Sequence, residues 1–304
     1  MTEATLPLAF DESERRLGFM ATTFAYTFWG FLPLYLHLLT FADVREVLGQ
    51  RVLWCVPAAT IAVFAMLGWK IGWSEIGKAL KPRMLATLAA SACFIFVNWG
   101  LYVWLVMTQR VIESSLAYFL TPLVAVAVGV LAYKERVTSA QLAALVLAGV
   151  GIIVQAFALG APPWMALALC GTWSMYIVIR KQAPVPAAVG LLIETLVLAP
   201  IAAGFLWWAS QSTPLAFGSS ASHSLLLLLA GPATAIPLTA FAYGARRVSF
   251  TTLGLLQFLA PTLQFATGIA FGEPFTALRA ASFALIWIGL ACFSWDTIRR
   301  ARMA

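Results

Sequence analysis

The sequence predicts an all-α integral membrane protein, because it is rich in apolar residues, poor in charge and arranged in long apolar runs. Of its 304 residues, 62% are hydrophobic and only 10% are charged, whereas a soluble domain carries about 25% charged residues. A soluble chain of this length could not cover its surface with so few charges. The runs approach ~20 residues, the length of a membrane-spanning helix, and lack the alternating ~10-residue segments of a β-barrel.

Ten such runs follow one another, and we expect each to form one membrane-spanning helix. The first follows a polar, acid-rich leader, residues 1–16, which lacks the basic start and short apolar core of a signal peptide. Short polar connections separate the others, and a basic tail, residues 298–304, follows the last. In order, the expected spans cover 17–39, 47–67, 84–107, 112–133, 139–159, 163–179, 186–210, 224–243, 250–271 and 277–295.

The basic residues are concentrated on one side of this arrangement. Of the 19 lysines and arginines, all but four fall in the leader, the tail and the connections on the same side as both termini; the four exceptions are Arg45, Arg51, Arg110 and Arg279. Basic residues are enriched in cytoplasmic loops, so both termini should be cytoplasmic. The net charge of +7 is then a topology signal, and we expect the lipid bilayer, and no nucleic acid, as a partner.

The two halves of the chain are similar to each other, which predicts an internal duplication. "LAYFLTPLVAVAVGVLAYKER" from Leu116 aligns with "LLQFLAPTLQFATGIAFGEP" from Leu255. Each unit, 17–159 or 160–297, holds five spans, so the second should enter the membrane from the opposite face and form an inverted repeat. The matched pairs are Phe119 and Phe258, Pro122 and Pro261, Glu135 and Glu273, Arg51 and Glu194, and Trp29 and Trp173.

Several segments resemble the ten-span, EamA-type transporters of the drug/metabolite transporter superfamily, most closely the RarD branch. They are "RVLW" from Arg51, "NWGLYVW" from Asn98, "IESSLAYFLTPL" from Ile112, "GLLIET" from Gly190 and "TTLGLLQFLAPTL" from Thr251. The resemblance implies a bacterial inner-membrane exporter of amino acids, related metabolites or drugs, with a central cavity between the two units. The RarD name is tied to chloramphenicol sensitivity. The second copy of the repeat departs from the pattern, because it is one residue shorter before Glu273.

Glu194 is the strongest candidate for a functional residue, because an ionised side chain within the bilayer costs at least ~2.5 kcal/mol. Without a partner, burial favours its protonated form, so it is a candidate proton carrier or a site for a cationic group. The structural alternatives are a carboxyl bonded to a neighbour such as Thr195, or a side chain that reaches cytoplasmic water. Whether Arg51, at the matched position, meets Glu194 is left open by the sequence.

Arg51 itself lies about five residues below the outer interface. It is either an anchor for a substrate carboxylate or a side chain that extends toward water. Asn98 either bonds the substrate or cross-links helices. Tyr118, Gln257 and Tyr26 share that ambiguity.

Two tryptophans, Trp29 and Trp173, are candidate cavity walls for aromatic or cationic groups, with packing as the alternative. Pro122 and Pro261 are candidate hinges because proline breaks helical hydrogen bonds. The four cysteines lie in apolar runs without metal-ligand spacing, so we expect free thiols, no metal and no cofactor.

The predicted function is a secondary transporter of small molecules, such as amino acids or amphipathic drugs, that works by alternating access as a monomer or homodimer. It contains no GxxxxGK[ST], HExxH or GxSxG motif, so we expect neither ATP hydrolysis through a P-loop nor the corresponding hydrolase chemistry. The alternatives are a passive facilitator or channel and a non-transporting assembly or sensor subunit. Proton coupling would distinguish a carrier from a passive pore.

Overall fold

The computed structural model describes residues 11–133, 138–160, 162–180, 182–248 and 250–303, and every regular element within them is an α-helix. The polypeptide therefore has the all-α fold that its sequence predicts. The helices are α1 (Glu12–His37), α2 (Val44–Ala79), α3 (Pro82–Met107), α4 (Val111–Tyr133), α5 (Ser139–Leu159), α6 (Trp164–Arg180), α7 (Ala187–Ser212), α8 (Ala221–Leu229), α9 (Pro232–Ala245), α10 (Phe250–Leu256), α11 (Leu259–Ala270) and α12 (Ala277–Met303).

Within the described ranges, seven helical segments are long and apolar enough to cross a membrane. They lie in α2, α3, α5, α7, α8 with α9, α10 with α11, and α12. The 17-residue α6 and the first part of α4 are shorter apolar helices. The chain is therefore a multi-pass membrane protein.

Two expected spans are divided. Residues 224–243 and 250–271 were each expected to form one continuous helix, but the first is split between α8 and α9 and the second between α10 and α11. Proline has no N–H to donate to the carbonyl four residues earlier. Pro232 begins α9, and Pro261 lies in the first turn of α11. Its partner in the repeat, Pro122, lies inside the unbroken helix α4, so the two candidate hinges differ.

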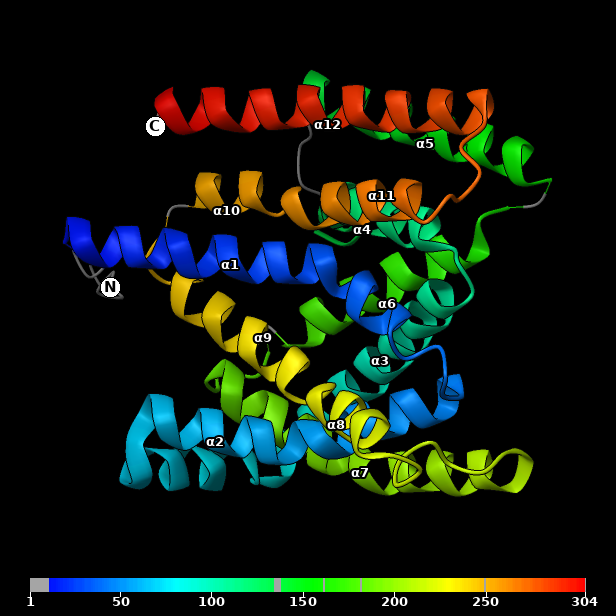
Figure 1. Cartoon of the computed structure of the whole chain (residues 1–304). Coiled ribbons are helices and arrows are strands. Elements are labelled where there is room, and N and C mark those ends of the chain that lie inside the picture. Colours follow the sequence, from blue (N-terminus) through cyan, green and yellow to red (C-terminus); the bar gives the residue numbers. More distant parts are fainter. Residues whose placement is uncertain (1–10, 134–137, 161, 181, 249, 304) are drawn as a thin grey trace.

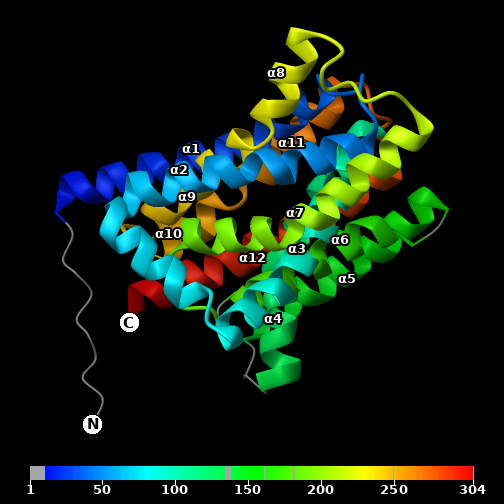
Figure 2. The same ribbon diagram turned by 90° about the horizontal axis from the view of Figure 1, so that it is seen from below.

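Helix ends also differ from the expected boundaries. The expected polar leader gives way to helix before its end, because the Asp11 side chain caps α1 by accepting the N–H of Glu14 at 2.7 Å. The expected basic tail continues α12 as far as Met303. Helix α2 runs 12 residues beyond the expected end at 67, but Gly68 has φ +72° and ψ 170° and kinks it. Only glycine adopts such angles without strain, and α2 turns near its end (Figure 2).

The helices pack as pairs that correspond between the two halves. Helices α5 and α12 lie against each other along one side of the molecule, and α2 and α7 form the opposite side (Figure 1). Between them, α1 packs on α9 and α11, while α6 packs on α3 and α4. The beginning of α1 and the end of α12 lie at the same end of the bundle (Figure 1).

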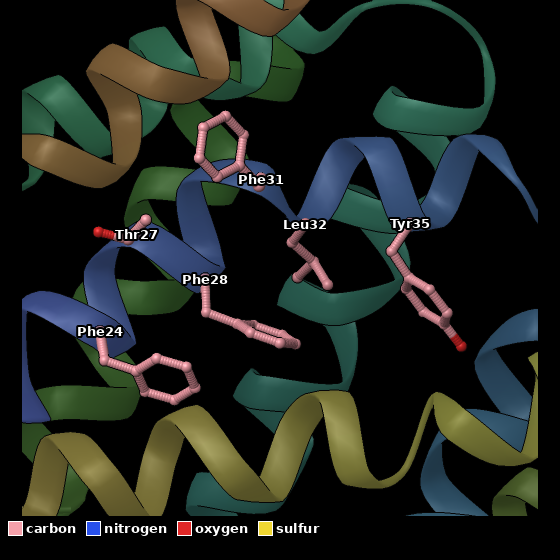
Figure 3. Close-up of a pocket in the computed structure, with 6 residues that line it drawn as sticks. All are labelled: Phe24, Thr27, Phe28, Phe31, Leu32 and Tyr35. Atoms are coloured by element: carbon pink, nitrogen blue, oxygen red, sulfur yellow. The ribbon is translucent and has the colours of Figure 1, made fainter.

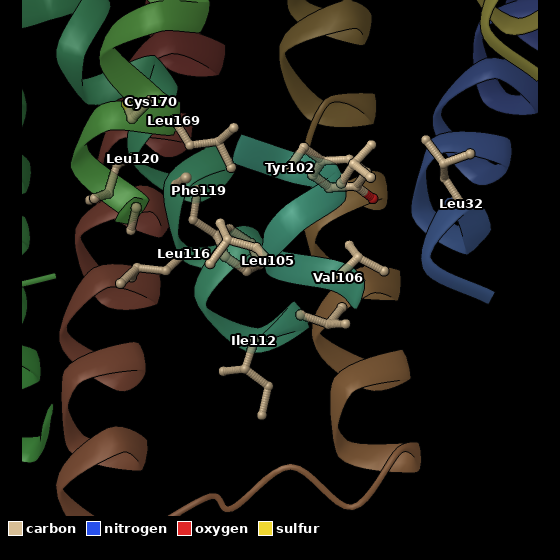
Figure 4. Close-up of a cluster of buried hydrophobic side chains, with 14 of the residues drawn as sticks. Leu32, Tyr102, Leu105, Val106, Ile112, Leu116, Phe119, Leu120, Leu169 and Cys170 are labelled. Carbon is tan, nitrogen blue, oxygen red and sulfur yellow. The ribbon is translucent and has the colours of Figure 1, made fainter. Parts of the chain in front are cut away.

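The helices approach one another closely where small residues meet. The backbone of Gly231, at the start of α9, lies against the Trp54 carbonyl of α2, and Gly244 lies against Gly18 and Thr22 of α1. Small residues of this kind allow close packing of helices in a membrane. A larger apolar cluster joins α3, α4 and α6, with Leu105, Leu116 and Leu169 at its centre (Figure 4). These contacts fix the helices that carry the candidate site.

Candidate functional site

Glu194 lies on α7 and is only 1% exposed. Its Oε1 accepts a hydrogen bond from Ser91 Oγ of α3 at 2.6 Å and lies 3.3 Å from Arg180 Nε of α6. The Tyr176 hydroxyl donates to Oε2 at 3.4 Å. The carboxyl is therefore held by three side chains from two other helices. Thr195, the neighbour considered as its partner, donates instead to the carbonyls of Leu191 and Leu192.

Arg180 reaches Glu194 across the backbone of Gly190. The last residue of α6, Arg180 also donates from Nη1 to the Ala183 carbonyl at 3.1 Å, which directs the side chain toward α7. A Cβ atom at Gly190 would collide with the guanidinium. Glycine one turn before Glu194 thus leaves the space in which the ion pair forms, and the charge of Glu194 is compensated inside the protein.

Arg51 lies on α2 and does not take Glu194 as its partner. Its Nε donates to Thr234 Oγ1 of α9 at 2.9 Å, and its guanidinium carbon lies 4.8 Å from the centre of the Trp99 ring. The residue is 7% exposed, and Nη1 is buried without a hydrogen-bond partner among the described residues. No acidic side chain in the described ranges pairs with it. A buried cation with an unused donor is well suited to bind an anion.

The packing of α2 on α7 determines how far apart Arg51 and Glu194 lie along the helices. Arg45 of α2 donates to Ser212 at the end of α7, and Gly49 lies against Ala202 and Leu206. The two helices therefore run antiparallel, and Arg51 lies opposite the middle of α7, near Ala202. Glu194 lies eight residues before Ala202. At 1.5 Å per residue, the backbones of the two residues are separated by roughly 12 Å along the helices.

Four aromatic side chains connect the surroundings of Arg51 with Glu194. Tyr102 and Tyr118 lie within electrostatic range of the Arg51 guanidinium, and their rings are 5.9 Å apart. The Tyr118 ring is 6.3 Å from that of Trp173, which is 5.5 Å from that of Tyr176. We call Tyr102, Tyr118, Trp173 and Tyr176 the aromatic row. The row ends at the Tyr176 hydroxyl that bonds Glu194.

Tyr102 also carries an unused polar group. Its hydroxyl is buried and has no hydrogen-bond partner among the described residues. The side chain extends from α3 toward Leu32 of α1 (Figure 4). An unsatisfied buried hydroxyl costs ~1–3 kcal/mol, so a polar group bound beside Arg51 would be stabilised by it.

An apolar groove of about 260 Å³ runs along α1. Phe24, Phe28, Leu32 and Tyr35 extend from the same side of the helix (Figure 3). Tyr35 ends the groove, and its hydroxyl donates to the Leu226 carbonyl at 2.6 Å. Because Tyr35 also lies within electrostatic range of Arg51, the groove leads from apolar surroundings to the buried cation.

Asn98 cross-links two helices. Its Nδ2 donates to the Leu169 carbonyl of α6 at 2.8 Å and to Thr172 Oγ1 at 3.2 Å. The residue is 1% exposed. Of the two roles considered for Asn98, the structure therefore displays the cross-link. Gln257 donates to the Gly254 carbonyl of its own chain segment, where α10 ends.

Tyr26 and Trp29 form an aromatic cluster of their own with Phe241 of α9, in which each pair of rings is 5.6 Å apart. Gln264 of α11 donates to the Trp29 carbonyl at 3.0 Å. These contacts place Tyr26 and Trp29 where α1 meets α9 and α11. They belong neither to the aromatic row nor to the lining of the α1 groove.

The acidic residues near the helix ends bind the backbone or neighbouring bases. Glu113 pairs with Arg110 in the turn before α4. Glu273 accepts the backbone N–H groups of Val111 and Ile112 at the start of α4; burial raises its pKa, and these two bonds oppose the rise. Glu135, its partner in the repeat, lies outside the described residues.

The four cysteines are free thiols, as expected. Within the described ranges, no group of three or more His, Cys, Asp or Glu residues could hold a metal ion.

Sequence reasoning missed the residues that surround the two charged groups, namely Ser91, Arg180 and Tyr176 at Glu194, and Thr234 and Tyr102 at Arg51. Arg180 was counted only as a basic residue at a helix end. The available signal was the short connection between α6 and α7. Because few residues separate the two helices, the first turns of α7 must lie close to Arg180 at the end of α6. Ser91 and Tyr102 carried no signal, since their roles depend on how α3 packs against α6 and α7.

Relatives of this chain are named as transporters, which are not enzymes. It is 40% identical to the protein RarD of Streptomyces exfoliatus over 96% of this chain and 92% of that protein. It is 35% identical to the uncharacterized transporter YojE of Bacillus subtilis, over 96% and 98% of the two chains. No family model matches. One protein of known crystal structure shares the fold with a TM-score of 0.59 and 23% identity, over 92% of this chain and 96% of that chain.

Proposed function

The chain belongs to the RarD family of transporters, and from this premise we propose that it exports small amphipathic molecules that carry a carboxylate. The observation that carries the proposal is Arg51, a buried cation near the Tyr102 hydroxyl; neither its Nη1 nor that hydroxyl has a hydrogen-bond partner in the part of the chain that the structure describes. A guanidinium and a hydroxyl together match the acceptors of a carboxylate. The apolar groove along α1 would take the apolar part of the same molecule.

Ten crossings of a bacterial inner membrane, with both termini in the cytoplasm, provide the frame for this function. The corresponding helix pairs support two inverted five-span units, and the shared position of the start of α1 and the end of α12 (Figure 1) supports termini on one side. Transporters built from inverted repeats bind substrate near the midplane where the units meet. Arg51, Glu194 and the aromatic row lie at contacts between helices of the two units.

Proton exchange through Glu194 would drive export. Arg180, a proton and the ammonium group of a substrate all compete for the same carboxylate, so at most one of them neutralises it at a time. A carrier that binds either a proton or a substrate at one carboxylate, but not both, exchanges the two across the membrane. The aromatic row would accept a cationic group between the two charged sites, because cations bind over aromatic faces.

The test of substrate class is transport by the purified protein in proteoliposomes. Amino acids with large apolar side chains would be compared with their methyl esters, which keep the ammonium group and lose the carboxylate. We expect the free acids to be exchanged and the esters to be poor substrates. Equal transport of both forms would contradict a carboxylate site. A passive pore would transport the free acids without any response to a pH gradient.

The orientation can be tested separately by thiol labelling in a variant that lacks the native cysteines. Ser212 follows Trp207 and Trp208 at the end of α7, and Gln182 lies in the connection after α6. A cysteine at Ser212 should react with an impermeant reagent added outside intact cells, and a cysteine at Gln182 should not. The reverse pattern would place the termini outside.

A further inference from the structure

A basic cleft lies where α2 joins α3, at a distance from Arg51. It has a volume of about 460 Å³ and is lined by Lys78, Lys81 and Arg83, together with Thr87 and Gln182. Lys78 is paired with Glu75. Neither Lys81 nor Arg83 has an acidic partner among the described residues, and both are exposed. The cleft therefore carries uncompensated positive charge and space for a small anionic group.

Apolar aromatic residues stand next to this charge. After the kink at Gly68, the last part of α2 exposes Trp69 and Trp73, which are 67% and 52% exposed. Ile76 of the same segment is buried against the protein. Exposed tryptophans of membrane proteins concentrate at the level of the lipid head groups. The tryptophans thus favour a position of the kinked segment, and of the cleft that follows it, at the level of the head groups.

We propose that this cleft binds the phosphate head group of an anionic phospholipid. The phosphate oxygens would accept from Lys81 and Arg83, and Thr87 and Gln182 offer further polar groups at the rim. Basic clefts between helices at the membrane surface are suited to such head groups, and each Lys or Arg near an anionic surface adds about 1 kcal/mol of attraction. One side of the cleft is formed at the start of α3, the helix that carries Ser91, and the other by the connection after α6, the helix that carries Arg180. The lipid would therefore tie together the helices that hold Glu194.

The experiment compares lipid binding by three forms of the purified full-length protein. The double variant Lys81→Gln/Arg83→Gln removes the two unpaired charges of the cleft. The control Arg15→Gln/Arg16→Gln makes the same change in charge on the exposed start of α1. Retention of phosphatidylglycerol and of phosphatidylcholine would be measured by native mass spectrometry, and affinity by titration of each lipid into detergent-purified protein.

We expect the wild-type protein and the control to retain phosphatidylglycerol in preference to phosphatidylcholine. The cleft variant should bind phosphatidylglycerol about 30-fold more weakly, since two charges of about fivefold each are lost. Gln182→Glu, which adds a negative charge to the rim, should weaken binding in the same direction. It serves as a second variant in case the double substitution impairs folding.

Two results would overturn the proposal. If the control loses as much affinity as the cleft variant, the binding reflects total charge and not the cleft. If glycerol 3-phosphate or inorganic phosphate displaces the lipid at equal concentration, the cleft is a site for a soluble anion. Neither result would bear on Arg51, because the transported substrate is tested by its own assay.

Discussion

Arg51 and Glu194 occupy the same position in the two halves of the chain, and each bonds a hydroxyl on a helix of the other half. Arg51 donates to Thr234 of α9, and Glu194 accepts from Ser91 of α3. The spacing within both matched pairs is the same (194 − 51 = 234 − 91 = 143). In the predicted duplication the two contacts are therefore equivalent with the charge reversed, one made by a cation that donates and the other by an anion that accepts.

The same spacing relates a second set of contacts. Asn98 of α3 bonds Leu169 and Thr172 of α6, and the residue 143 positions later, Phe241 of α9, packs on Tyr26 and Trp29 of α1. The contact between α3 and α6 is made by hydrogen bonds, whereas the contact between α9 and α1 is made by aromatic rings. This correspondence supports the predicted duplication and leaves the polar groups asymmetric, as a site for an asymmetric molecule requires.

The first prediction concerns Arg51. Arg51→Gln should raise the KM for carboxylated substrates by about 30-fold or more, because loss of one partner in a buried charged pair costs at least ~2 kcal/mol. Arg51→Lys should restore little, since an ammonium cannot bind a carboxylate in the two-pronged way of a guanidinium. The control is Arg45→Gln on the same helix, where the arginine is half-buried and pairs with Asp43. An unchanged KM in Arg51→Gln would remove Arg51 from the site.

Much of the architecture was predictable from sequence, because the cost of placing polar groups in a bilayer is large and local. The apolar runs therefore predicted the helical class and a multi-pass membrane protein. Glu194 and Arg51 were found for the same reason. Their partners were not, since Ser91 and Thr234 look like ordinary small polar residues of a membrane helix. Only the packing of α3 on α7, and of α9 on α2, gives them a function.

The helix breaks show a second limit. Pro122 and Pro261 are matched in sequence, yet α4 continues through the first and α11 begins just before the second. The missing N–H is the same in both, so proline by itself does not decide whether the helix is interrupted. Sequence alone therefore identifies candidate hinges without distinguishing which of them interrupts its helix.

The second prediction tests whether the Asn98 amide joins two helices or binds the substrate. Asn98→Ala should lower the apparent melting temperature by about 1–3 °C, because a hydrogen bond between membrane helices contributes ~0.6 kcal/mol. The KM for substrate should stay within about twofold of wild type. Thermal unfolding in detergent at one scan rate and transport in proteoliposomes measure the two effects. A large rise in KM with unchanged stability would show instead that Asn98 contacts the substrate.

Close packing around Gly231 supports a third prediction. Its backbone is in the ordinary helical region, with φ −66° and ψ −60°, so alanine is permitted by its dihedral angles and any loss of stability must be steric. A Cβ there would collide with the backbone of Trp54 and Cys55, and overpacking costs ~1–3 kcal/mol. Gly231→Ala should therefore reduce folded yield and thermal stability.

Gly204→Ala is the matched control for that experiment, because a Cβ at this position of α7 meets no other described group within 4 Å apart from the adjacent backbone of its own helix. Alanine is a better helix former than glycine by ~1 kcal/mol, so this variant should be at least as stable as wild type. Equal destabilisation of the two variants would mean that glycine is needed for a reason other than contact between helices.

The last prediction tests the coupling of protons to transport. Glu194→Gln retains the size of the side chain and its bond to Ser91 but cannot lose or gain a proton. It should fold and exchange substrate across the membrane, yet no longer accumulate substrate in response to a pH gradient. Gly190→Ala should have a similar effect by another route, since its methyl group displaces the flexible guanidinium of Arg180 from Glu194 without moving the backbone. Gly171→Ala on α6, where a Cβ meets open space, is the control and should respond to pH as wild type does. If Glu194→Gln transports like wild type at every pH, the carboxylate only joins α3, α6 and α7. If Gly190→Ala alone behaves normally, the proton still acts on Glu194 but Arg180 is not its competitor.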